Sequence, residues 1–271
     1  RPGRAALIGF GWGLGAFLAG VGWLYVAMHR YGGMPVPLAA LALLLFCAYL
    51  GIYPALAMGL QARLRRGVFW FDALLFAACW TLGEMLRGWA FTGFPWLAIG
   101  YSQTPPSPLA GWAPVLGVYG LSFFLALLAA LLARLIRGAW KAKAFRWQAL
   151  AILFAVPVFG VGLGLIRWTE PVGKPLSVAL LQTNVAQDEK WQPGRFADWL
   201  DLNYTLVERQ NGARLIVLPE TSLPMLADHL PEGYLDALRQ GVSGRGSDLI
   251  VGVFTREGRS IHNSAVLFGA S

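Results

Sequence analysis

The chain has 271 residues, of which 56% are hydrophobic and only 13% are charged. Soluble globular domains carry about a quarter charged residues, so this composition excludes a chain that is soluble throughout. The two cysteines, Cys47 and Cys79, both lie inside apolar runs. That placement favours buried thiols and gives no support to a disulfide framework or a zinc site.

The charge is divided unevenly along the chain. Residues 1–168 contain 13 Lys and Arg against 2 acids, a net charge of +11, whereas residues 169–271 contain 9 against 12, a net charge of −3. The positive charge therefore belongs to the apolar part, where basic loops beside bilayer-length runs explain it better than nucleic-acid binding does. We expect a transmembrane helical bundle over residues 1–168, followed by a separate α/β domain.

Helices that cross a bilayer need roughly 20 mostly apolar residues. Five segments qualify: 5–28, 36–60, 69–89, 112–133 and 147–168. The connections carry 2, 1, 3, 1 and 5 Lys or Arg in chain order, the last set being Arg134, Arg137, Lys141, Lys143 and Arg146. Because loops rich in Lys and Arg face the cytoplasm, this alternation predicts that the residues after Trp168 are extracytoplasmic.

Two charged residues lie inside the third segment. Glu84 and Arg87 are three positions apart and so share one face of a helix. Charges are costly within a membrane span, so we expect a structural ion pair that faces the interior of the bundle. Residues 92–106, which follow, are too rich in Pro and Gly to span, and predict an ordered extracytoplasmic or re-entrant loop.

The composition of the sequence changes after a linker at residues 169–175, from long apolar runs to shorter apolar segments between polar ones. Short apolar runs predict strands, and runs with helical spacing predict helices. The expected strands are 176–182, 214–218, 249–254 and 264–268, and the expected helices are 195–210 and 231–242. This order is typical of an α/β layered domain that ends in a hairpin, here over residues 176–271.

Glu220 is the best catalytic candidate by position. It comes directly after the strand at 214–218, and working groups of α/β sheets sit at the carboxyl ends of strands. Pro219 and Pro224 bracket a stiff turn that could hold the carboxylate over the sheet edge for general-base work. A solvated loop acid or a helix cap is the plainer interpretation of the same residue.

Several segments carry a resemblance to a known family. Residues 214–221, RLIVLPET, resemble the strand and Pro-Glu segment of the nitrilase superfamily. With the membrane bundle before it, the chain resembles the apolipoprotein N-acyltransferase family of bacterial inner membranes. The further matching segments are YGGMP at 31–35, EMLRGW at 84–89, TGFPW at 92–96, GYSQ at 100–103, Gln182, Lys190-Trp191 and His262-Asn263-Ser264.

This resemblance implies a nitrilase-like αββα sandwich and a two-step acyl transfer through a cysteine thioester. The donor would be a phospholipid resembling phosphatidylethanolamine, and the acceptor the α-amine of a diacylated lipoprotein. Carried over by position, Glu220 is the general base, Trp191 belongs to the substrate region and Asn263 is a supporting polar residue. Neither a metal nor another cofactor is implied, and the enzyme is placed in the inner membrane with its α/β domain on the periplasmic side.

One part of the family pattern is missing. The family's catalytic Lys and Cys follow the Glu, whereas the last lysine here is Lys190 and both cysteines lie in the membrane segments. We therefore expect the sequence to be part of a longer enzyme, with neither Cys47 nor Cys79 as the nucleophile. Two alternatives stay open: a membrane-anchored amidase of the nitrilase type, and a membrane binding module without catalytic activity.

Overall fold

The computed structural model describes residues 1–137 and 143–269, which form two compact units. The first unit comprises Arg1–Glu170 and the second Pro171–Ser271. Lys141, one of the basic residues counted in the last connection, lies outside the described residues.

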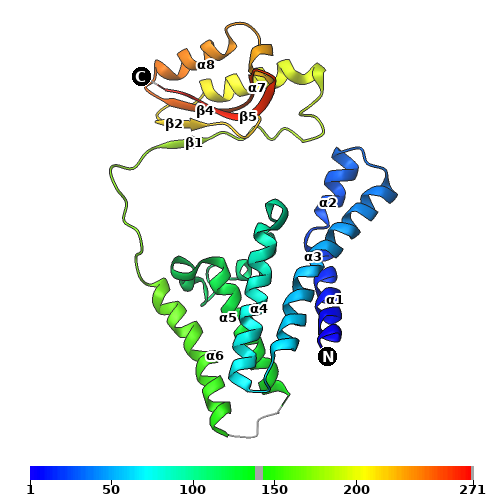
Figure 1. The fold of residues 1–271 in the computed structure, drawn as a ribbon. Helices are drawn as coiled ribbons and strands as arrows, with labels where there is room; N and C mark the ends of the chain where they lie inside the picture. The colour runs from blue at the N-terminus through cyan, green and yellow to red at the C-terminus, as the bar shows by residue number, and fades with distance from the viewer. Residues whose placement is uncertain (138–142, 270–271) are drawn as a thin grey trace. The chain divides into compact units, whose positions relative to one another are not determined.

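In the described residues of the first unit, the regular elements are all helices (Figure 1). Its long helices are α1 (Pro2–Gly20), α3 (Val36–Leu64), α4 (Phe69–Trp89), α5 (Ala113–Ile136) and α6 (Lys143–Gly164). Shorter pieces are α2 (Trp23–Val26), a π-helical turn (Ala27–Tyr31) and 3₁₀ turns at Ala90–Thr92, Ile99–Ser102 and Ala110–Trp112. Among the described residues, four helices are long and apolar enough to cross a membrane, or five if the bent first pair counts as one span.

The first expected span, 5–28, is not one straight helix. Helix α1 ends at Gly20, and the chain bends by 53° before the next helical piece begins at Trp23. The break falls at Gly20-Val21-Gly22, where two glycines weaken the helix. The last helix also differs from the expected 147–168, because α6 ends at Gly164 within a run of glycines rather than at Trp168.

Small residues let the helices of this unit approach one another closely. Gly9 and Gly13 of α1 face the α3 backbone, and a Cβ on Gly13 would lie 3.0 Å from the Cα of Gly51. Phe17 and Val21 then pack with Cys47 and Leu50 in one buried cluster. Helix α1 is therefore fixed along α3 by close packing.

The second unit is a mixed sheet with two helices. The strands are β1 (Val178–Leu180), β2 (Leu215–Val217), β3 (Leu223–Leu226), β4 (Asp248–Glu257) and β5 (Ser260–Phe268). The helices are α7 (Phe196–Glu208) and α8 (Tyr234–Ser243), with 3₁₀ turns at Pro193–Arg195 and Ala227–His229. The strand order is β1-β2-β4-β3, all parallel, and β5 pairs antiparallel with β4, which confirms the expected hairpin.

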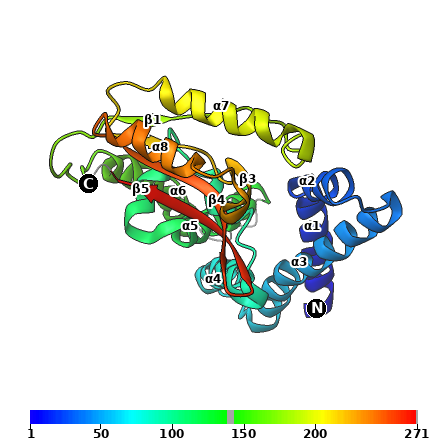
Figure 2. The same cartoon turned by 90° about the horizontal axis from the view of Figure 1, so that it is seen from above.

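Both helices of this unit cover the same face of the sheet, where they lie side by side (Figures 1 and 2). Leu249, Val251 and Val253 of β4 point towards them and are almost completely buried. Because side chains alternate along a strand, Ile250, Gly252 and Phe254 face the other side. The core of the unit thus lies between the sheet and the two helices.

Strand β3 was not expected from the sequence, since Pro224 argues against a strand. The structure tolerates this proline because β3 is the last strand in the order and pairs only with β4. Its other edge needs no donor from residue 224. The chain after Glu220 therefore returns to the sheet instead of continuing as a loop.

Candidate functional site

Glu220 lies where the chain leaves the sheet and rejoins it. Strand β5 pairs with β4 from Leu249 to Glu257, so that edge of β4 is occupied. Strands β2 and β3 must share the other edge, β2 opposite Asp248–Ile250 and β3 opposite Val253–Phe254. The Leu218 nitrogen still donates to the Ile250 carbonyl oxygen at 2.9 Å, whereas residues 219–222 bulge out of the ladder, and Glu220 lies within the bulge.

This bulge lies directly over Gly252. A Cβ at residue 252 would come within 2.5 Å of the Thr221 nitrogen and 2.6 Å of the Pro219 oxygen. Thr221 itself has a positive φ of 51° and is buried. Positive φ is costly for a residue with a branched side chain, so the surrounding contacts must hold the turn in place.

Two polar side chains supply such contacts. The Ser222 hydroxyl donates to the Gly252 carbonyl oxygen at 3.2 Å. The Asn203 amide of α7 donates to the Ser222 carbonyl oxygen at 2.9 Å and to the Trp199 carbonyl oxygen at 2.7 Å. Asn203 is only 1% exposed, so loss of either bond would leave a buried polar group unsatisfied. The turn that carries Glu220 is thereby fastened to both β4 and α7.

The Glu220 side chain is exposed and is held by Asn263 of β5. The Asn263 amide nitrogen donates to the Oε1 atom of Glu220 at 2.6 Å. Asn263 lies opposite Phe254 in the ladder, on the sheet face that the helices leave open. The structure therefore brings together Glu220 and Asn263, which are 43 positions apart.

Lys190 also contacts this turn. Its Nζ atom donates to the main-chain oxygen of Glu220 at 3.1 Å and lies 5.8 Å from the ring centroid of Trp191. Trp191 packs in turn against Phe254, with ring centroids 5.9 Å apart. Lys190 and Asn263 therefore both contact Glu220. The strands that carry Asn263 and Phe254, β5 and β4, also support Trp191 through Phe254.

Lys190 was not predicted as a site residue. The only sequence signal was its place beside Trp191 in a matching segment, and nothing in the sequence relates residue 190 to residue 220. Burial lowers the pKa of the Lys190 ammonium, and the Glu220 carboxylate acts in the opposite direction because it favours the charged form. The lysine is thus a partly buried cation beside the candidate base.

A polar cavity of about 210 Å³ adjoins these residues. It opens at the carboxyl ends of β1 and β2, and its lining includes Gln182, Asn184, Lys190, Glu220 and Ser222. Within the described ranges, no group of three or more His, Cys, Asp or Glu could hold a metal ion. Amide, ammonium and carboxylate groups suit this cavity to hydrogen bonding and proton transfer.

The other residues singled out from the sequence lie in the helical unit. Cys47 and Cys79 are free, buried thiols in α3 and α4. Glu84 and Arg87 are also buried, but the hydrogen bonds of both side chains go elsewhere than to each other. Glu84 accepts from Trp80 and from the Ile99 main chain, while Arg87 donates to main-chain oxygens of residues 94 and 96.

We predict that Gly252→Ala displaces the turn that carries Glu220. The added methyl group cannot fit under the Pro219 and Thr221 backbone, so the bond between Glu220 and Asn263 should be lost. A structure of the variant checks this directly. Gly244→Ala is the control, because its Cβ would meet only the Gln240 oxygen at 3.5 Å. An unmoved Glu220 in Gly252→Ala would contradict the prediction.

We also predict that the Lys190 amine loses its proton below the pH that is usual for lysine, because its pKa is lowered by burial. Competitive labelling with an amine reagent across a pH series, read by mass spectrometry, gives the midpoint for this residue. The substitution Phe254→Ala should raise that midpoint, since it opens the packing around Trp191 to water. A wild-type midpoint at or above the ordinary value would show the prediction to be wrong.

Comparison with known proteins places these features in a family. Residues 1–131 match the family model described as apolipoprotein N-acyltransferase N-terminal domain. A Nitrosomonas europaea protein named apolipoprotein N-acyltransferase is 44% identical over 100% of this chain and 54% of its own length. Proteins of the same name from Chromobacterium violaceum and Ralstonia nicotianae are 44% and 45% identical, over 98% and 91% of this chain and 51% and 46% of their own lengths.

The similarity is not confined to the helical unit, because these relatives align with nearly the whole chain. The chain spans about half the length of the curated relatives it matches. The family model, the relatives and the membrane-type helices agree: the chain is similar over its whole length to the matching part of proteins named apolipoprotein N-acyltransferase.

Proposed function

We propose that the intact protein is a phospholipid-dependent N-acyltransferase. A cysteine thiolate would attack an ester carbonyl of a phosphatidylethanolamine-like lipid, and a lysophospholipid would leave as the thioester forms. The α-amine of a diacylated lipoprotein would then attack the thioester, which releases the thiol and forms an amide. The relatives' shared name and the fixed position of Glu220 support this proposal.

In this reaction Glu220 is the general base. In the first step it would take the proton of the thiol and pass it to the leaving oxygen of the lysophospholipid, and in the second it would take the proton of the amine and pass it to the leaving thiolate. Asn263 holds Oε1, so the second oxygen is the one that exchanges protons, and the rigid turn keeps it in a constant position. We take the thiol from the part of the longer relatives that this chain does not span, since Cys47 and Cys79 are buried between helices of the other unit.

We further propose that the sheet belongs to a nitrilase-like sandwich. The face away from α7 and α8 is apolar but open: Val178, Leu180 and Leu267 are 48%, 77% and 62% exposed. Leu267 is opposite Ile250 in the ladder, which places it on that face. Two sheets pack through faces of this kind, so a second sheet is the expected cover. Trp191 would lie at the rim of the substrate site, beside Lys190.

For the membrane region we propose that residues 1–168 form the bundle and residues 169–175 the linker to the α/β domain at 176–271. The location would be the bacterial inner membrane, with the α/β domain on the periplasmic side. Alternating Lys and Arg content of the connections and the apolar helices support this orientation. The donor lipid and the lipoprotein acceptor would both reach the site from the membrane.

We expect Glu220→Gln to lower acyl-thioester formation by at least about 100-fold in the intact protein, because the amide cannot accept the proton. Labelled phospholipid and a diacylated lipopeptide are the substrates, and mass spectrometry detects the products. Glu232→Gln removes an exposed acid elsewhere in the same unit and serves as the control. An undiminished thioester yield in Glu220→Gln contradicts the assignment of the base, and free fatty acid without acylated peptide would indicate a hydrolase.

The orientation is tested separately. We expect Asp201→Cys, an exposed position on α7, to react with a membrane-impermeant thiol reagent applied from outside the inner membrane. The unchanged protein, whose Cys47 and Cys79 are buried, measures the background. Labelling that requires lysis of the cells would reverse the proposed orientation.

A further inference from the structure

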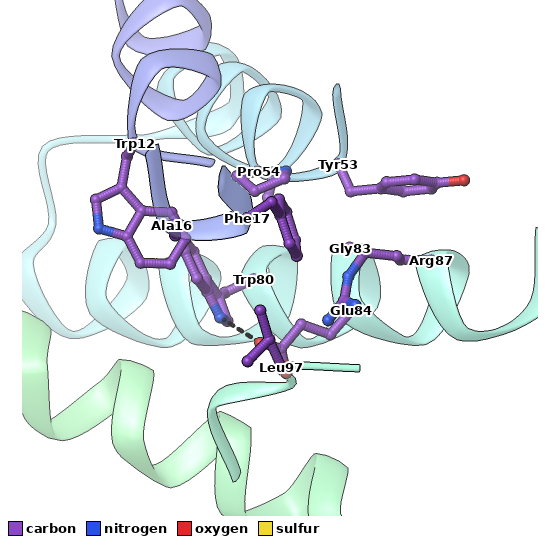
Figure 3. A pocket seen from close by; sticks show the side chains of 11 residues that line it. Trp12, Ala16, Phe17, Tyr53, Pro54, Trp80, Gly83, Glu84, Arg87 and Leu97 are labelled. Carbon is purple, nitrogen blue, oxygen red and sulfur yellow. Dashed lines mark hydrogen bonds between the residues drawn. The ribbon is translucent and has the colours of Figure 1, made fainter. Parts of the chain in front are cut away.

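A small cavity of about 40 Å³ lies inside the helical unit, where α1, α3 and α4 meet (Figure 3). Aromatic side chains form much of its wall, including Trp12, Phe17 and Trp80. Glu84 and Arg87 of α4 reach the same cavity and are only 7% and 2% exposed. Two buried charges thus adjoin one small space.

Only one oxygen of the Glu84 carboxylate has a partner. Oε1 accepts from the Trp80 indole at 3.1 Å and from the Ile99 main-chain nitrogen at 2.9 Å. Oε2 is fully buried and has no hydrogen-bond partner among the described residues. A buried, unpaired carboxylate oxygen loses its hydration without compensation, which is unfavourable. Oε2 of Glu84 therefore needs a hydrogen-bond donor.

Arg87 does not supply that donor directly. Its Nη1 atom donates to the carbonyl oxygen of Phe94 at 2.6 Å and also to that of Trp96. The guanidinium packs over the Phe17 ring, 5.1 Å from its centroid. A guanidinium has five donors, so these contacts leave it able to bind another acceptor.

Size and charge together select what can fill the cavity. Its volume has room for about three water molecules at most and none for a lipid headgroup. A cation would be repelled by Arg87 and an anion by Glu84. A neutral molecule that both donates and accepts hydrogen bonds meets the needs of both side chains.

We propose that an ordered water molecule occupies this cavity, donating to Oε2 of Glu84 and accepting from the guanidinium of Arg87. The water joins the two charges indirectly, as polar groups too far apart for direct contact are commonly joined. The joined network holds residues 94–99, since Glu84 binds the Ile99 nitrogen and Arg87 binds two carbonyl oxygens of the loop. The charged pair is thereby a positioning device for the loop that follows α4.

The direct test is a structure of the intact protein in lipid at a resolution that shows ordered water. Density within hydrogen-bond distance of both Oε2 of Glu84 and the Arg87 guanidinium is expected. An empty cavity, or a direct contact between the two side chains, would overturn the proposal.

A cavity-filling substitution tests the consequence for the loop. Ala16 lines the cavity, so Ala16→Val should displace the water and leave Oε2 without a donor. We expect the amides of Phe94 and Ile99 to exchange with solvent about 10-fold faster, measured by hydrogen–deuterium exchange. Filling a dry cavity would instead add apolar contacts and leave exchange unchanged or slower.

Ala19→Val is the matched control, because it adds the same atoms at an exposed position of the same helix. Faster exchange confined to residues 94–99 of Ala16→Val supports the proposal. Unchanged or slower exchange there contradicts it, as does an equal acceleration throughout α1 and α3, which would indicate general overpacking. Neither experiment depends on acyl transfer, so the outcome is independent of the proposed function.

Discussion

The close approach of one turn to Gly252 is the constraint on which the candidate site depends. Strand β4 has two edges, and β5 occupies one of them along its length, so β2 and β3 share the other with a bulge between them. The bulge can approach β4 this closely only because residue 252 has no side chain. Glu220 lies in this bulge, and its carboxylate is exposed.

The rest of the site is built around that turn from distant parts of the chain. Asn203 fastens it from α7, Asn263 binds the carboxylate from β5, and Lys190 binds the main chain from the segment before α7. Each contact alone is a modest hydrogen bond. Together they hold the turn, and Asn263 also holds the carboxylate, as the proposed general base needs if its geometry is to stay constant.

In the helical unit, side chains also bind the main chain of an irregular segment, but in apolar surroundings. A loop inside or beside a membrane must satisfy its main-chain groups without much water. Glu84 and Arg87 do this for residues 94–99 by binding main-chain atoms of the loop. The two charges would be costly alone, and their role as partners of the backbone explains why they occur in an otherwise apolar helix.

The sequence by itself determined the division into an apolar basic part and an acidic α/β part, most strands and helices, and Glu220 as the residue after a buried strand. These features follow from composition and periodicity, which are local. It missed β3, the break after Gly20, the part played by Lys190 and the separate partners of Glu84 and Arg87. The break after Gly20 has a local cause in its two glycines. The other three were decided only by the tertiary structure, because each depends on which distant backbone lies alongside: the edge of β4, the turn above Gly252 and the loop after α4.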